Sequence, residues 1–175
     1  MDNRTRKIHF LVEAGLIGAL YAVLTYVSSM MGLAYGEVQF RISEALTILP
    51  VFTPAAIPGL VIGCIIANIG SPFGMVDIVC GSFATLAAAG FSYAVRKCSV
   101  KDVPWLAPVG PVLANAVIVG LEIAWFLPEG VTWAGFAASA VSVGLGELAI
   151  CFGLGLPLAV LVERTGLGRR LSLTL

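Results

Sequence analysis

The sequence predicts an all-α membrane protein with six transmembrane helices in a single integral membrane domain that spans residues 1–175. The chain is 59% apolar and only 11% charged, with a mean hydropathy of +1.00, whereas a soluble domain of this size needs more charge to cover its surface. The apolar residues fall into six segments, which at roughly 20 residues per span would use about 120 residues. No room remains for a separate soluble domain.

The six segments are expected at about residues 10–31, 41–56, 59–69, 75–95, 104–127 and 135–162. The first follows a polar, basic N-terminus and has no small-residue cleavage site, so we interpret it as a retained span and not a signal peptide. The second and third are short, and Pro50, Pro54 and Pro58 recur every four residues. This region is therefore expected to kink or re-enter the membrane.

The basic residues predict the orientation. Nine of the ten fall on one side if the N-terminus is inside: Arg4, Arg6, Lys7, Arg96, Lys97, Lys101, Arg164, Arg169 and Arg170. The positive-inside rule then gives an N-in, C-in topology. Its cytoplasmic parts are the N-terminus (about 1–9), a loop (about 96–103) and the C-terminus (about 163–175), and an outer loop covers about 32–40.

The remaining basic residue, Arg41, lies in a polar motif at residues 35–46, YGEVQFRISEAL. If this motif is helical from Glu37, then Glu37, Arg41 and Glu44 share a face and can pair. Such a motif fits a solvated helix start with an ordinary ion pair. It also fits a lid or rim over an outward cavity, which makes Gln39, Arg41 and Glu44 candidate substrate-binding residues.

Four polar residues lie at membrane depth: Asn68, Asn115, Glu122 and Glu147. A carboxylate inside the hydrocarbon costs roughly 3 kcal/mol on insertion scales, so such residues usually face a cavity or a partner. Asn115 and Glu122 are seven residues apart, which places them about 20° from each other on one helix face. The two carboxylates could converge in a substrate site, or each could be neutral or paired as an interhelical contact.

The three tryptophans fall near the expected ends of spans. Trp105 and Trp133 fit an interfacial belt. Trp125 also fits that belt, but it follows Glu122 by three residues and could stack on a flat ring. It is therefore included among the candidate substrate-binding residues.

The first span carries small residues at four-residue spacing, Ala14, Gly18 and Ala22, with Gly15 and Ala19 beside them. Small-xxx-small stripes allow another helix to approach closely. The approaching helix could belong to a partner protein or to the same chain.

Sequence motifs for enzymatic chemistry are missing. There is no Walker A sequence, no G-x-S-x-G and no H-E-x-x-H, and His9 is the only histidine. The four cysteines are scattered singly, so neither a disulfide framework nor a zinc site is indicated. We therefore expect no catalytic residues, no metal and no cofactor, although an intramembrane enzyme using Glu122 and Glu147 is an alternative that lacks an accompanying nucleophile or ligand set.

The run YGEVQFRISEALTILP at residues 35–50 resembles the QueT family, substrate-binding (S) components of energy-coupling-factor (ECF) transporters. The resemblance extends over the chain in length, six-span layout and cytoplasmic ends. It implies an ECF S-component-like bundle in a prokaryotic plasma membrane. The bundle would capture a queuosine precursor, a 7-deazaguanine such as 7-aminomethyl-7-deazaguanine or queuine, and would topple in the membrane to release it inside.

The resemblance also implies partners. A separate transmembrane coupling protein and two ATPase subunits would use the ATP, and no nucleic acid would be bound. Ala14, Gly18 and Ala22 match the alanine-x-x-x-alanine pattern by which such components dock the coupling protein, with glycine in the middle. The alternatives are an S component for another vitamin or purine-like solute, and a membrane scaffold without a transport role.

Overall fold

The structure is a computed structural model that describes residues 2–35, 39–101 and 103–171, without the side chains of residues 169 and 170. Apart from an isolated bridge between Val100 and Val103, the regular elements of this part are helices. They are α1 (Asn3–Met30), the 3₁₀ helix η1 (Ile42–Val51), α2 (Ala56–Asn68), α3 (Met75–Ala94), α4 (Val109–Trp125), α5 (Trp133–Ile150), the π-helix η2 (Cys151–Gly155), α6 (Leu156–Arg164) and α7 (Leu167–Leu171). The all-α prediction is confirmed for these residues.

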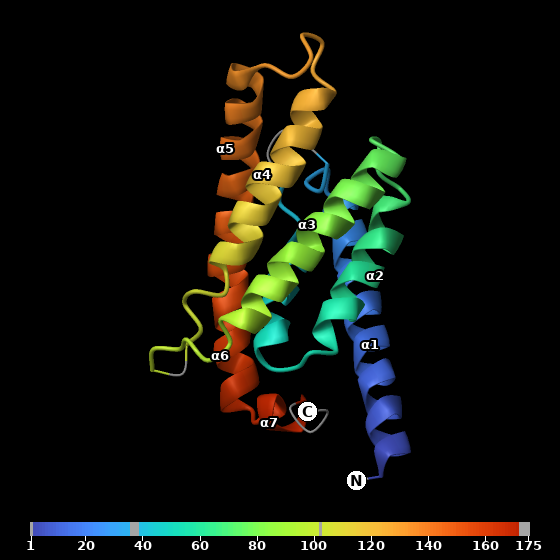
Figure 1. Ribbon diagram of the computed structural model, residues 1–175, viewed down its shortest axis with the longest axis vertical. Helices are drawn as coiled ribbons and strands as arrows, with labels where there is room; N and C mark the ends of the chain where they lie inside the picture. Colours follow the sequence, from blue (N-terminus) through green and yellow to red (C-terminus); the bar gives the residue numbers. More distant parts are fainter. Residues whose placement is uncertain (1, 36–38, 102, 172–175) are drawn as a thin grey trace.

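The helices form an elongated bundle in which the chain reverses direction between successive segments (Figure 1). It rises through α1, descends through η1, rises through α2, descends through α3 and rises through α4. It then descends through α5, η2 and α6, which follow one another without a break, and both ends of the chain lie at the lower end of Figure 1. The order of segments matches the six apolar runs expected from the sequence.

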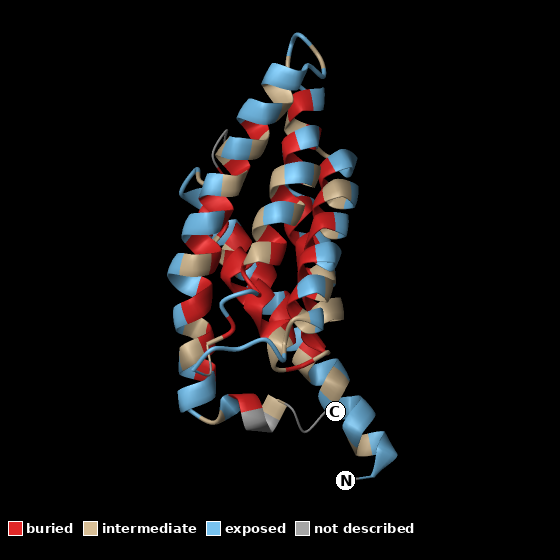
Figure 2. Cartoon of the chain, turned by 60° about the vertical axis from the view of Figure 1, so that its left-hand side comes forward, coloured by how far each residue is buried: buried red, intermediate tan, exposed pale blue. Residues whose placement is uncertain are grey.

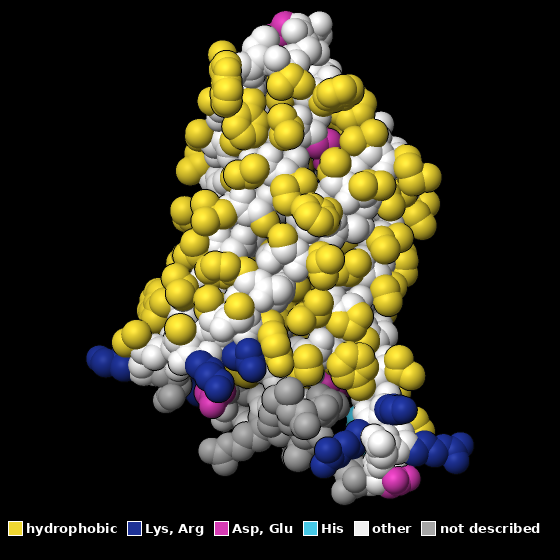
Figure 3. All heavy atoms as spheres, viewed as in Figure 1, with side chains coloured by type: hydrophobic (Ala, Val, Ile, Leu, Met, Phe, Trp, Pro, Cys, Tyr) yellow, Lys and Arg dark blue, Asp and Glu magenta, His cyan; other side chains and the backbone are white. Residues whose placement is uncertain are grey.

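Three helical stretches in the described residues are long and apolar enough to cross a membrane: Asn3–Met30, Met75–Ala94 and the continuous Trp133–Arg164. The helices η1, α2 and α4 are apolar but shorter. Apolar side chains cover most of the face seen in Figure 3, and Lys and Arg gather at its lower end. We call this the basic end. An apolar surface above a basic end is typical of a multi-pass membrane protein.

The first helix is longer than expected because it begins at Asn3, inside the polar N-terminus. Asp2 caps it, since its side chain accepts a hydrogen bond from the Asn3 backbone N–H at 2.7 Å. An N-cap carboxylate of this kind satisfies one of the free N–H groups of the first turn. The basic segment before the apolar run is therefore part of α1.

Helices α1 and α2 pack backbone to backbone through small residues. A Cβ added at Gly59 would lie 2.6 Å from the Ala14 carbonyl oxygen, and one added at Gly63 would lie 2.6 Å from that of Gly18. Ala14, Gly18 and Ala22 are all buried there. The helix that approaches Ala14 and Gly18 in the structure is therefore α2 of the same chain, which is one of the two alternatives given by the sequence, because only glycines on α2 allow so close an approach.

The short second segment, η1, lies inside the bundle. Its residues Ser43 to Pro50 are buried without interruption, and buried residues line the inner faces of the helices around it (Figure 2). Because a 3₁₀ helix rises about 2.0 Å per residue, the ten residues of η1 extend about 20 Å, against about 15 Å for an α-helix. The expected proline-rich irregularity is present, with Pro50 inside η1 and Pro58 in the first turn of α2.

The irregular helices η1 and η2 contact each other in the middle of the bundle. Glycines permit the close approach: a Cβ at Gly155 would lie 3.4 Å from the Ala45 carbonyl oxygen, and one at Gly146 only 2.1 Å from that of Gln39. The segment before η1 is thereby pressed against α5. This contact brings the polar motif at residues 39–44 to the acidic residue that follows Gly146.

Candidate binding site

Seven of the eight candidate substrate-binding residues are at most 5% exposed: Gln39, Arg41, Glu44, Asn68, Asn115, Glu122 and Glu147. Polar and charged groups removed from water cost free energy unless they are hydrogen-bonded or paired. The hydrogen-bond partners of each side chain therefore separate the residues that support the fold from those that have unpaired polar atoms.

Arg41 is fully engaged within the protein. Its Nε donates to the Ala34 carbonyl oxygen at 3.0 Å, Nη1 donates to Asn68 Oδ1 at 3.4 Å, and Nη2 lies 3.4 Å from Asp77 Oδ2 in an ion pair. The guanidinium also stacks over the Tyr35 ring, 5.0 Å from its centroid. These contacts fasten the segment between α1 and η1 to the beginning of α3.

The expected pairing of Arg41 with Glu37 and Glu44 on one helix face is wrong for Glu44. Residues 39–41 are not helical, since η1 begins only at Ile42. Arg41 and Glu44 therefore do not share the expected helix face, and the partner of Arg41 is Asp77 of α3. Glu37 lies outside the described residues.

Asn68 also has a structural role. Its Nδ2 donates to the Asp77 backbone carbonyl at 2.9 Å, and its Oδ1 accepts from Arg41. A Cβ at Gly81 of α3 would lie only 2.5 Å from Asn68 Nδ2, so glycine is required for this contact. Asn68 thus joins α2 to α3 and has both of its polar atoms occupied.

Glu44 is half satisfied. The Tyr21 hydroxyl of α1 donates to Glu44 Oε1, and Thr25, one turn further along α1, donates to Ser43 Oγ at 2.7 Å. Glu44 Oε2 is buried without a hydrogen-bond partner. The contacts fix the carboxylate in place and leave one oxygen free to accept a hydrogen bond.

Glu147 of α5 lies next to Glu44. The Cys151 thiol is 3.4 Å from Glu147 Oε2 and 3.6 Å from the Glu44 carbonyl oxygen, within donating distance of both. The Asn115 side chain of α4 lies beside both carboxylates, but its Nδ2 does not reach hydrogen-bond geometry with either. Two acids and an amide from three helices therefore meet at this point.

Glu122 lies two turns beyond Asn115 on α4, toward α3, within electrostatic range of Asp77 and Cys80. Both of its carboxylate oxygens are buried without a hydrogen-bond partner. The Gln39 amide nitrogen is in the same condition, and the Gln39 backbone contacts Gly146, the residue before Glu147. Seven residues of α-helix place Glu122 about 10 Å along α4 from Asn115, on nearly the same face. We give these buried polar side chains one name, the open polar cluster: Gln39, Glu44, Asn115, Glu122 and Glu147.

Chemically, the open polar cluster offers two amide groups that can donate hydrogen bonds and three carboxyl groups that can accept them. Among the described residues, no group of three His, Cys, Asp or Glu side chains is arranged to hold a metal ion. Several N–H donors and at least one acceptor would complement the groups of the cluster.

The structure places Trp125 outside this cluster. Its side chain is 70% exposed at the end of α4, which fits the interfacial belt; stacking on a ligand stays a prediction. Sequence reasoning also missed Tyr21, which donates to Glu44 from α1, and Cys151, which contacts Glu147 one turn further along the same continuous helix. The tyrosine gives no pattern by which its partner could be recognised, whereas the four-residue spacing of Glu147 and Cys151 is that of neighbours on one helix face.

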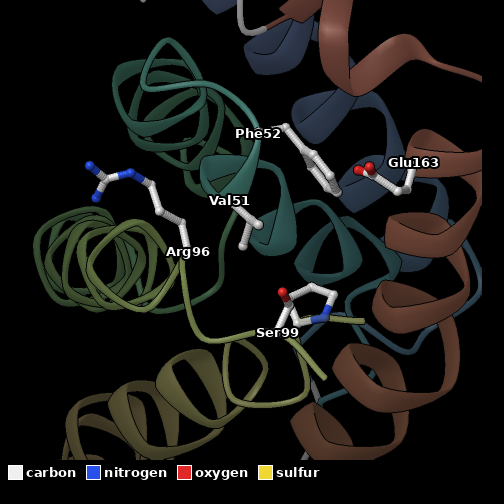
Figure 4. Close-up of a pocket in the computed structure, with 6 residues that line it drawn as sticks. Val51, Phe52, Arg96, Ser99 and Glu163 are labelled. Atoms are coloured by element: carbon white, nitrogen blue, oxygen red, sulfur yellow. The ribbon is translucent and has the colours of Figure 1, made fainter. Parts of the chain in front are cut away.

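A separate hollow of about 160 Å³ opens at the basic end, where the end of η1 meets the α3–α4 connection and α6. Figure 4 shows the Glu163 carboxylate turned toward the Phe52 ring, whereas the Arg96 side chain extends away from the hollow. Arg96 instead stacks on the Tyr93 ring at 3.8 Å. None of the open polar cluster lines this hollow.

Comparison with known proteins gives two matches and one negative result. The family model of the QueT transporter matches residues 11–164. The Queuosine precursor transporter QueT of Lactococcus lactis subsp. cremoris (strain MG1363) is 36% identical over 80 residues, which is 46% of this chain and 47% of the relative, so the match spans about half of that protein's length. No solved structure matches. The family match covers most of the described bundle and indicates a transporter, not an enzyme: the chain belongs to the QueT transporter family.

Proposed function

We propose that the chain is the substrate-binding membrane subunit of an ECF-type importer that captures a queuosine precursor, a 7-deazaguanine such as 7-aminomethyl-7-deazaguanine or queuine. The observation that carries this proposal is the open polar cluster. Five of its atoms are buried without a partner: Gln39 Nε2, Glu44 Oε2, Asn115 Nδ2 and both Glu122 oxygens. A bound molecule with complementary groups would remove the free-energy cost of leaving them unpaired.

A 7-deazaguanine has those groups. Its pyrimidine edge presents a ring N–H and an amino group side by side, which one carboxylate accepts in a bidentate manner, and its carbonyl oxygen accepts from an amide N–H. Gln39 and Asn115 supply such amides, and Glu122 has two free oxygens. The named relative is a queuosine precursor transporter, which supports the same class of solute.

The proposal includes six membrane crossings with both chain ends in the cytoplasm of a prokaryotic cell. Support comes from Figure 3, in which the basic side chains lie at one end below the apolar surface. Gln39 lies before the start of η1 and Glu122 lies in the half of α4 that is away from that end. With this orientation the ligand would enter from outside.

ATP-driven uptake requires partner subunits, a transmembrane coupling protein and two ATPases. Because α2 covers the Ala14 stripe, we propose that the coupling protein docks on the other side of α1. Gly15 and Ala19 are exposed there, and a Cβ at Gly15 would meet nothing within 4 Å. Small residues on an open face allow close helix approach.

Binding to the purified protein in detergent tests the proposal, with calorimetric titration of 7-aminomethyl-7-deazaguanine, queuine, guanine and a panel of vitamins. A charge-assisted hydrogen bond contributes roughly 1.5–3 kcal/mol, so Glu122→Gln should weaken deazaguanine binding about ten- to a hundredfold. Glu129→Gln is the matched control, because Glu129 is an exposed acid in the α4–α5 connection. Binding of another solute in preference to every deazaguanine would overturn the proposal, as would full affinity in Glu122→Gln.

A further inference from the structure

The buried charges around the candidate site do not balance. Among the described residues, the buried charged side chains are the four acids Glu44, Asp77, Glu122 and Glu147, and one base, Arg41. Arg41 is paired with Asp77 and engaged on its other nitrogens by Asn68 and a backbone carbonyl. Three of the described buried acids therefore have no basic partner among the described buried side chains.

The three acids have two different environments. Glu122 stands apart toward α3, with both oxygens free. Such a carboxylate can accept two parallel N–H bonds, the geometry offered by a ring N–H beside an amino group. A ligand edge of this kind needs no net charge to bind there.

Glu44 and Glu147 instead lie within electrostatic range of each other. Neutral donors hold each of them: the Tyr21 hydroxyl donates to Glu44, and the Cys151 thiol contacts Glu147. Two like charges that close together and away from water repel each other strongly, and a proton or a cation between them removes the repulsion. In the absence of a ligand a proton shared between the two acids removes the repulsion, and the ammonium group of a ligand can take the place of that proton when it binds.

We propose that two parts of one ligand bind in these two environments: Glu122 accepts hydrogen bonds from the ring N–H edge, and the Glu44–Glu147 pair binds a positively charged substituent. The inference rests on the proposed function and names the ligand class within it. The site selects deazapurines that carry a protonated amine, and it discriminates against neutral ones of the same ring system and nearly the same size.

Two ligands share the deazaguanine ring and differ only in the substituent at position 7. 7-Aminomethyl-7-deazaguanine carries an ammonium group at neutral pH, and 7-cyano-7-deazaguanine carries a neutral nitrile at the same position. Both offer the same N–H edge to Glu122. The parent protein should bind the amine at least tenfold more tightly, because only its ammonium group can donate charge-assisted hydrogen bonds to the paired acids.

The deciding experiment measures both affinities in the parent and in three variants, with thermal melting to verify folding. Glu147→Gln should weaken amine binding about ten- to a hundredfold and change nitrile binding less than threefold, so the preference disappears. Glu44→Gln should do the same and provides a second reading if Glu147→Gln folds poorly. Glu122→Gln should weaken both ligands by the same factor and preserve the preference.

The inference is overturned if the parent binds amine and nitrile equally, or if Glu147→Gln and Glu44→Gln weaken both ligands alike. It is also overturned if Glu122→Gln affects only the amine, since the two roles would then be exchanged. Failure of the proposed function has a different signature, in which neither deazaguanine binds the parent protein at all. Glu129→Gln again serves as the control and should retain both affinities.

Discussion

Replacing Gly63 with alanine tests the packing of α1 on α2, on which the position of Glu44 depends. The added Cβ would lie 2.6 Å from the Gly18 carbonyl oxygen, 2.8 Å from Tyr21 Cβ and 3.1 Å from Gly18 Cα. Two of these atoms are backbone and cannot rotate away, so the cost should fall near the upper limit of about 3 kcal/mol for overpacking. Alanine gains about 1 kcal/mol over glycine in helix propensity, which leaves a net destabilisation of about 2 kcal/mol.

Gly15→Ala is the matched control, because it adds the same methyl group to α1 where nothing lies within 4 Å. It should keep the propensity gain of up to about 1 kcal/mol. The two variants should therefore differ by about 3 kcal/mol, measured as unfolding in mixed micelles of increasing denaturing detergent. Gly63→Ala should also weaken ligand binding, because the methyl group displaces Tyr21, which holds Glu44. Equal stabilities of the two variants would refute the described α1–α2 contact.

Two further predictions address the ion pair and the open face of α1. Arg41→Gln should destabilise the protein by about 3–5 kcal/mol, because it leaves Asp77 buried without its ion-pair partner. The double variant Arg41→Gln, Asp77→Asn should recover part of that loss in the same unfolding measurement. No recovery would argue against direct pairing. Gly15→Leu should abolish uptake into cells expressing the partner subunits while ligand binding is unchanged and stability does not fall below that of the parent. Unchanged uptake would exclude this face as the docking surface.

Local pattern was sufficient to predict the helices but not the partners of their polar side chains. The apolar runs and the recurrence of Pro50, Pro54 and Pro58 gave the segment order and the irregular second segment. The predicted partner of Arg41 was wrong because the prediction assumed helical spacing for residues 39–41. These residues are not helical, and Gln39 among them packs against Gly146 of α5. Asp77, 36 positions away, could only be found in three dimensions.

The small-residue stripe is a second case in which the sequence predicts a contact but not the partner that makes it. Ala14, Gly18 and Ala22 predict that a helix approaches closely, and one does, but the sequence does not say whose helix it is. The answer lies in Gly59 and Gly63, whose spacing on α2 is complementary. Trp125 and Glu122 likewise lie three residues apart on α4, yet one is exposed and the other buried, because neighbouring helices cover only one face of α4.

The burial of η1 has a consequence for biosynthesis. A segment whose residues Ser43 to Pro50 are all enclosed by protein has no face prepared for lipid, so it gains little from entering the bilayer alone. Glu44 on η1 contacts Tyr21, which is synthesised before it, and Cys151, which follows it by 107 positions. The environment of Glu44 therefore stays incomplete until the continuous helix that contains Glu147 and Cys151 has been synthesised. The site therefore assembles after translation of the C-terminal helix and not progressively, and nascent chains that stop before Cys151 will lack it.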